Sequence, residues 1–221
     1  MRQPPNAMQF LLLIFVFVLA VVVLYLGVLT LALDKLGLST HSAMLLLACT
    51  LVGSGINMPL FQISADAPPD EEIRNLQGLL FGKPLPFTGK TIVAVNVGGA
   101  LIPISFSIYL ASINPLTLGQ ILPAIAIVTT VCYLTSRPVR GLGIGMPVFV
   151  APLTAALTAI LIAPDNSAPM AYVCGTLGVL LGADILRLND IRKIGTAVAS
   201  IGGAGTFDGI FLTGIVAVLL A

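Results

Sequence analysis

Long apolar runs, separated by short polar connectors, take up most of this chain of 221 residues. Hydrophobic residues make up 57% of the chain and charged residues only 9%, which is far from the balance of a soluble globular domain. A helix of about 20 apolar residues is long enough to cross the hydrocarbon layer of a bilayer. The composition therefore predicts an all-α, polytopic membrane helix bundle whose first partner is the lipid bilayer.

Seven such runs can be drawn as predicted transmembrane helices, and together they form a single transmembrane domain over residues 1–221. The fourth and fifth runs are the shortest, so six helices are an alternative. The first run is too long for the core of a signal peptide, so we expect it to be retained. The predicted helices cover residues 8–33, 42–61, 91–113, 120–135, 146–163, 168–186 and 196–221.

The distribution of Lys and Arg predicts the orientation in the cell membrane. With seven helices, Lys35 falls on one side, and the other side receives Arg2, Arg74, Lys83, Lys90, Arg137, Arg140, Arg187, Arg192 and Lys193. Because basic loops stay in the cytoplasm, the N-terminus and the connector 62–90 are predicted to be cytoplasmic, and the C-terminus to lie outside. The net charge of +1 gives no indication of nucleic-acid binding.

Two carboxylates, Asp184 and Asp208, fall inside the last two predicted helices. A charged side chain at the bilayer centre costs about 3 kcal/mol, and it usually faces the protein interior or a water-filled cavity. Asp184 is three residues before Arg187 and is predicted near the cytoplasmic surface. Asp208 is twelve residues past Thr196, or about 18 Å along a straight helix. Carboxylates at two depths favour a proton or cation relay over a catalytic pair.

Glycines and hydroxyl side chains surround Asp208 in the sequence. The glycines serve either for close packing of helices or for an unwound segment whose free backbone groups bind a substrate or ion. We predict the second use, with two asparagines as polar partners inside the bundle. The predicted substrate- or ion-binding residues are Asp208, Asp184, Asn57, Asn96, Ser200, Gly202, Gly203 and Thr206.

No metal site or cofactor is predicted. Cys49, Cys132 and Cys174 all fall inside predicted helices and lack the spacing of metal ligands or a redox motif. We therefore interpret the three cysteines as small, buried packing residues.

Two pairs of segments indicate an internal repeat. Residues 95–100, Val-Asn-Val-Gly-Gly-Ala, resemble residues 199–204, Ala-Ser-Ile-Gly-Gly-Ala. Before them, residues 52–57 can be set against residues 179–184. The matched helices are four apart along the chain, so the two copies are predicted to run in the same direction. Chance similarity between glycine-rich apolar helices is the alternative.

A repeat of this kind predicts three helices, one linking helix and three helices, as in parallel-repeat transporters. The repeat units would be residues 8–113 and 146–221, joined by the helix 120–135. The alignment pairs Asn57 with Asp184. Each unit then places a polar side chain near the cytoplasmic end of one helix and a Gly-Gly pair in the next.

The whole chain resembles an uncharacterised family of prokaryotic integral membrane proteins, domain of unknown function 1614. The segments that carry the resemblance are Arg137-Pro138 through Gly145, Gly182-Ala183-Asp184, and Ser200 through Phe211. This resemblance implies a membrane protein and no particular activity.

The chain also resembles, in part, the intramembrane aspartyl proteases of the presenilin and signal-peptide-peptidase type. Those proteases carry aspartates on two consecutive helices, the second in a Gly-x-Gly-Asp motif, and Asp184 and Asp208 match this order and orientation. The motif itself is not met, because two residues separate Gly205 from Asp208. Ala183 also stands where the family has Tyr, and no predicted helix follows Asp208 to carry its Pro-Ala-Leu element.

We predict a proton- or cation-coupled transporter of a small solute or ion. Asp208 would be the central coupling carboxylate and Asp184 its relay on the cytoplasmic side. The first alternative is an intramembrane aspartyl protease, in which Asp184 and Asp208 are the catalytic dyad and a transmembrane peptide is the substrate. The second alternative is a structural membrane protein.

Overall fold

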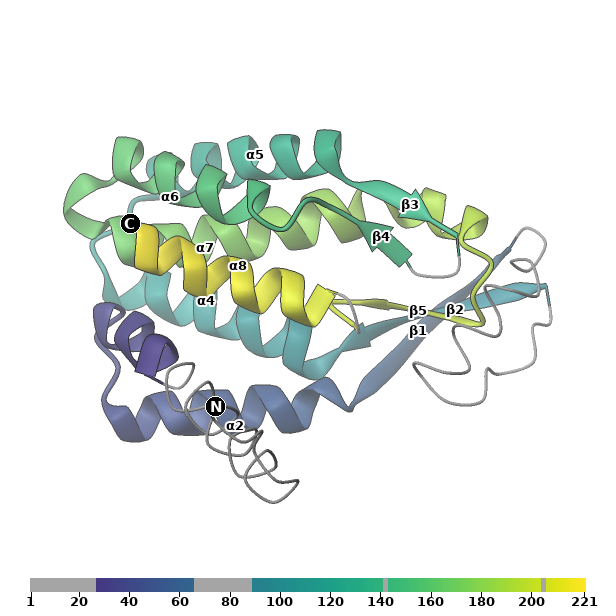
Figure 1. The fold of residues 1–221 in the computed structure, drawn as a ribbon, viewed down its shortest axis with the longest axis horizontal. Coiled ribbons are helices and arrows are strands. Elements are labelled where there is room, and N and C mark those ends of the chain that lie inside the picture. The colour runs from purple at the N-terminus through teal and green to yellow at the C-terminus, as the bar shows by residue number, and fades with distance from the viewer. Residues whose placement is uncertain (1–26, 66–88, 141–142, 204–205) are drawn as a thin grey trace, which may run out of the picture.

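A bundle of helices lies side by side along the long axis of the molecule, and a small β-sheet extends from one end (Figure 1). The computed structural model describes residues 27–65, 89–140, 143–203 and 206–221. We call the end that carries the strands the sheet end. The C-terminus lies at the opposite end (Figure 1).

The helices from α4 to α8 alternate in direction between the two ends (Figure 1). Their bounds, with the segment Gly27–Lys35 at the start, are α2 Thr40–Ser54, α4 Ile102–Ile113, α5 Leu118–Thr135, α6 Val150–Ile162, α7 Ser167–Val179 and α8 Thr206–Leu220. Shorter turns join them: the π-helical η1 Val97–Leu101 and η3 Leu180–Ile185, and the 3-10 helices η2 Pro164–Asn166 and η4 Leu188–Lys193.

Helix α7 is the centre of the bundle and packs against α4, α5, α6 and α8. Glycines of α7 and of η3, which continues it, allow this close packing. A Cβ on Gly178 would lie 2.5 Å from Val128 Cγ1, and one on Gly182 would lie 2.5 Å from the carbonyl oxygen of Thr129. The cysteines are free thiols; Cys132 and Cys174 are buried as predicted, whereas Cys49 is exposed. The packing interpretation is therefore wrong for Cys49, which lies on an outward face of α2.

Three strands form the main sheet, in the order β1-β2-β5. They are β1 Asn57–Ser64, β2 Lys90–Asn96 and β5 Val198–Ile201. Strand β2 pairs with β1 in antiparallel fashion and with β5 in parallel fashion. A second, two-stranded hairpin consists of β3 Arg137–Val139 and β4 Gly143–Gly145.

These strands correct the all-α prediction, because parts of three predicted transmembrane helices, 42–61, 91–113 and 196–221, are strands. The fold is mostly helical with a small sheet. The run Thr91-Ile92-Val93-Ala94-Val95 is short, apolar and rich in β-branched side chains, and apolar content alone does not distinguish such a run from a buried helix. In this protein, pairing with β1 and β5 makes the run a strand.

Among the residues that the structure describes, two helices are long and apolar enough to cross a membrane, Leu118–Thr135 and Pro164–Ile185. The pair Gly27–Lys35 and Thr40–Ser54, bent by 113°, adds a third if it counts as one span. The prediction of seven transmembrane helices is not confirmed in the described residues. Large apolar side chains nevertheless point outward from several helices, among them Leu51, Leu122 and Leu161, the last 82% exposed. Such surface is unusual for a soluble monomer and suits lipid tails.

The described Lys and Arg residues are distributed unevenly between the two ends of the molecule. Lys35 lies at the end opposite the sheet, where its Nζ donates to the carbonyl oxygens of Val218 and Leu219 at 3.4 and 3.2 Å. The other described Lys and Arg residues belong to segments at the sheet end: Lys90, Arg137, Arg140, Arg187, Arg192 and Lys193. Most of the predicted connector 62–90 lies outside the described residues, and its two ends are in β1 and β2.

Candidate functional site

Two Gly-Gly segments meet at the sheet end, and four of the predicted site residues lie beside them: Asp184, Asn57, Asn96 and Ser200. Strand β2 leads through η1 into α4, and β5 leads through Gly202 and Gly203 towards α8. Because β2 and β5 are parallel, both segments leave the sheet at the same end, the one next to the helix bundle, and lead on towards α4 and α8 (Figure 1). The two segments predicted as a repeat thus share one local plan, a strand, two glycines and a helix.

The backbones of these two segments touch. A Cβ on Gly99 would lie 1.7 Å from the carbonyl oxygen of Gly202, and a Cβ on Gly202 would lie 2.6 Å from the carbonyl carbon of Gly99. Gly202 also has φ of +68°, a conformation that favours glycine. The glycines here therefore provide both the close contact and the non-helical backbone that the sequence analysis treated as alternatives.

Asp184 is buried in η3, with only 6% of its surface exposed. Its Oδ2 accepts a hydrogen bond of 2.8 Å from the backbone N–H of Gly202. Among the described residues, the ion pairs join Asp190 to Arg187 and Lys193, and none involves Asp184. A carboxylate buried with a backbone partner and without a cationic one is costly, and this makes Asp184 a candidate for function rather than stability.

Asn57, Asn96 and Ser200 form a hydrogen-bonded network beside the glycines. Asn96 Nδ2 donates to the carbonyl oxygen of Ser54 at 2.7 Å and to Asn57 Oδ1 at 3.0 Å, and Ser200 Oγ donates to the same Asn57 oxygen. Asn96 Oδ1 in turn accepts from the backbone N–H of Gly99 at 2.7 Å. The network joins one residue from each of β1, β2 and β5.

Asp208 and Thr206 lie in the first turn of α8, which begins at Thr206. Their side chains are outside the part of the chain that the structure describes. The expected helix from Thr196 onward is wrong, since residues 198–201 form β5. Asp208 is therefore at the sheet end of its helix, as Asp184 is of its own, and the predicted offset of about 18 Å along a straight helix from Thr196 is wrong.

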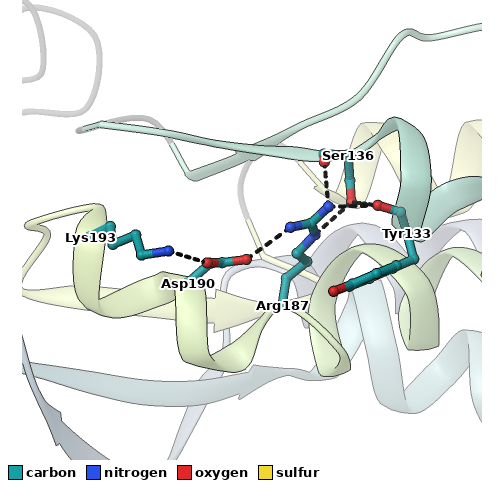
Figure 2. Close-up of polar contacts among 5 residues, drawn as sticks. All are labelled: Tyr133, Ser136, Arg187, Asp190 and Lys193. Atoms are coloured by element: carbon teal, nitrogen blue, oxygen red, sulfur yellow. Dashed lines mark hydrogen bonds and ion pairs between the residues drawn. The ribbon is translucent and has the colours of Figure 1, made fainter.

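Arg187 is a residue whose structural role the sequence analysis missed (Figure 2). Its Nη2 donates to the carbonyl oxygens of Tyr133 and Ser136 at 2.6 and 2.8 Å, and its Nε donates to Ser136 Oγ at 3.2 Å. The guanidinium group also lies 4.3 Å from the centre of the Tyr133 ring. Arg187 thereby caps the C-terminus of α5 and fixes the chain just after Asp184.

Asp190 completes this cluster by accepting from Lys193 Nζ at 2.8 Å and Arg187 Nη1 at 2.9 Å. The hydrogen bond from Lys193, and then that from Arg187, lowers the pKa of Asp190 from its usual value of 3.8. A lowered pKa stabilises the folded state above pH 3.8, and this contribution is lost as the pH falls through the folded-state pKa.

Asp190→Asn is therefore expected to lower the free energy of unfolding at neutral pH by less than about 1 kcal/mol, as for other partly exposed ion pairs. The difference from wild type should shrink once the pH drops below 3.8. Thermal unfolding followed by circular dichroism in detergent, at several pH values, measures it. A difference that grows on acidification contradicts this assignment.

Comparison with known protein families identifies the family of this chain. The family model described as protein of unknown function, DUF1614, matches residues 51–220. The chain belongs to the DUF1614 family. The match includes the five described strands and both helices that carry the aspartates, so the site described above lies within the DUF1614 region. No curated protein and no solved structure matches the chain.

Proposed function

We propose that this protein is a membrane-embedded aspartyl protease in which Asp184 and Asp208 form the catalytic pair. The observation that carries the proposal is the 2.8 Å hydrogen bond from Gly202 N to Asp184 Oδ2. This hydrogen bond holds the buried carboxylate of Asp184 against the backbone of Gly202, which is only six residues before Asp208. The partial resemblance to presenilin-type proteases points the same way, although the Gly-x-Gly-Asp motif is not met.

The break before α8 also supports the pairing. A dyad requires the two carboxyl groups to approach to about 3 Å, so the chain before Asp208 cannot continue as a straight helix deep into the bundle. Residues 198–201 are a strand, Gly202 has a positive φ, and α8 begins at Thr206. Asp208 is then within the first turn, at the same end as Asp184.

The proposed chemistry uses one proton shared between two carboxyl groups. The ionised carboxylate takes a proton from water while the water oxygen attacks the carbonyl carbon of the peptide bond, and the protonated carboxyl donates to the carbonyl oxygen. Collapse of the tetrahedral intermediate breaks the C–N bond. The leaving amine takes up the proton that came from water, and the hydroxyl formed from the carbonyl oxygen gives its proton back to the other carboxylate as the new C=O bond forms. One carboxyl group is then protonated and one ionised, as at the start.

Strand β5 offers a place for a substrate. Within the described residues it is at one edge of the sheet, next to β2 alone, and it leads directly through Gly202 towards Asp208. An extended peptide can add to such an edge by main-chain hydrogen bonds. A membrane-associated peptide unwound next to β5 would present its backbone close to the proposed pair.

The proposed setting is the cell membrane, with several helices crossing it and the sheet end in the cytoplasm. Two apolar helices of sufficient length, the outward-facing apolar side chains and the basic residues at the sheet end support this orientation. The substrate would then be cut near the cytoplasmic surface, at the depth where α8 begins.

A proton- or cation-coupled transporter is the second candidate. Chain interruptions at Gly98-Gly99 and Gly202-Gly203, each beside a polar side chain, are the kind of discontinuity at which transporters bind ions. The common plan of strand, glycines and helix also favours a parallel repeat. The transporter ranks second because the separation in depth that favoured a relay is no longer expected.

One reconstitution separates the two candidates. The purified full chain is placed in liposomes that contain a pH-sensitive dye and a set of labelled single-span peptides. The protease proposal expects new peptide termini, identified by mass spectrometry, without a proton flux that depends on the protein. Protein-dependent proton flux with intact peptides overturns it in favour of transport.

A further inference from the structure

The sheet end carries an exposed basic surface that the proposed chemistry does not use. We define the hairpin surface as the exposed cations of the β3–β4 hairpin and η4, namely Arg137, Arg140, Arg192 and Lys193. Strand β3 packs against η4, so the two segments form one surface. The acidic residue of these segments is Asp190, and Arg187 and Lys193 already pair with it.

The position of this surface relative to the apolar helices indicates what it faces. Arg137 follows the end of Leu118–Thr135 by two residues, and η4 begins three residues after the end of Pro164–Ile185. A strand advances about 3.3 Å per residue, so Arg137 is within about 7 Å of the end of its helix. The headgroup layer of each leaflet is about 5 to 7 Å thick, so the cations are at its depth.

The hairpin also presents apolar surface beside the charge. Val139 shares a face of β3 with Arg137, because alternate residues of a strand point the same way, and it is 39% exposed. An apolar side chain flanked by arginines suits the boundary between headgroups and acyl chains better than bulk water.

We propose that the hairpin surface binds the phosphate groups of anionic phospholipids in the leaflet at the sheet end. Charge complementarity selects this occupant, since Arg137, Arg140 and Arg192 have no acidic partner among the described residues and lie near the level of anionic headgroups. Each cation near an anionic membrane surface strengthens binding roughly fivefold. The inference depends on the protein being embedded in the membrane and not on the protease chemistry.

The chain contains no Trp, so a single introduced Trp is a clean reporter. Val139→Trp places it on the hairpin, and Leu161→Trp places a control on α6, at a side chain that is 82% exposed near the opposite end. Each variant is reconstituted in mixed phosphatidylglycerol and phosphatidylcholine bilayers in which one lipid is brominated. Bromine quenches Trp fluorescence at short range and reports which lipid is next to the reporter.

At position 139 we expect brominated phosphatidylglycerol to quench the Trp fluorescence several-fold more than random mixing at its mole fraction would give. At position 161 quenching should follow mole fraction. Adding Arg137→Gln, Arg140→Gln and Arg192→Gln together to the Val139→Trp variant should return quenching to mole fraction. Each of the three alone should lower the excess quenching, whereas Lys90→Gln, which also removes one charge but lies in β2, should not.

Three outcomes overturn the proposal. Equal quenching by both lipids at position 139 means that the surface does not select anionic lipid. Quenching at position 161 without quenching at position 139 means that the surface stays in water, where an acidic protein segment is the alternative occupant. The absence of quenching at both positions shows that the chain is not embedded, and this removes the membrane setting as well.

Discussion

Asp184→Asn and Asp208→Asn are each expected to abolish peptide cleavage by the reconstituted protein. General acid–base catalysis by one positioned group contributes about 10²- to 10⁴-fold, and a shared-proton pair loses its function when either member is neutralised permanently. We therefore expect a loss of at least about 10³-fold for each variant. The double variant should be no slower than the single ones, because residues that act as a unit are not additive.

The substitution at position 184 separates chemistry from folding. Asparagine retains a side-chain oxygen that can accept the hydrogen bond from Gly202 N, so Asp184→Asn should preserve the contact seen at 2.8 Å. Asp165→Asn is the matched control, because Asp165 is exposed in η2 at the opposite end of the bundle. Equal thermal stability of all three variants, with cleavage retained only by Asp165→Asn, is the expected result.

Cleavage within tenfold of wild type in Asp184→Asn or Asp208→Asn would remove the protease proposal. If the protein instead moves protons and only Asp208→Asn stops the flux, the transporter with a central Asp208 becomes the better account. If neither variant changes cleavage or flux and only stability falls, the aspartates are structural.

The amino-acid sequence predicts the parts of this fold that depend on local composition. Helix α5 and the continuous segment from α7 through η3 match the predicted helices at residues 120–135 and 168–186 closely. The gathering of basic residues at one end also follows from counting Lys and Arg between apolar runs. These features need only helix length and side-chain polarity, both of which are visible in a short window of sequence.

The strands depend on distant partners, which a short window does not contain. Strand β2 is flanked by β1 and β5, and Thr91 Oγ1 donates to the carbonyl oxygen of Thr196, 105 residues away. An isolated run such as Thr91 to Val95 is equally compatible with a helix. Strand β5 likewise depends on its pairing with the distant strand β2. A short window of sequence therefore does not predict where β5 ends and α8 begins, or the level of Asp208.

Site residues could be named from their type but not from their contacts. The sequence shows Asn57, Asn96 and Ser200 as polar residues in apolar surroundings, and the structure places them in one hydrogen-bonded network. The sequence indicates only a role in membrane orientation for Arg187, because its carbonyl acceptors lie 51 and 54 residues away in sequence. The Gly-Gly pairs were a visible signal, but their mutual contact was not.

That contact leads to the second large effect, since Gly99→Ala is expected to destabilise the protein severely. The added Cβ would lie 1.7 Å from the carbonyl oxygen of Gly202, and the backbone at both residues is held in place by neighbouring strands and helices. Overpacking a well-ordered core costs about 1 to 3 kcal/mol when side chains can adjust, so a backbone clash should exceed this range. The displacement of Gly202 should also break its hydrogen bond to Asp184.

Gly119→Ala is the matched control, because the nearest atom to its added Cβ is Thr117 Oγ1 at 3.9 Å and the residue lies in α5. Alanine is favoured over glycine in a helix by about 1 kcal/mol, so this variant should be as stable as wild type or slightly more so. Circular dichroism melting and amide hydrogen exchange at Gly202 measure both effects. Wild-type melting and protected exchange in Gly99→Ala would mean that the two segments are further apart than the structure places them, and the link between Asp184 and the start of α8 would fail with it.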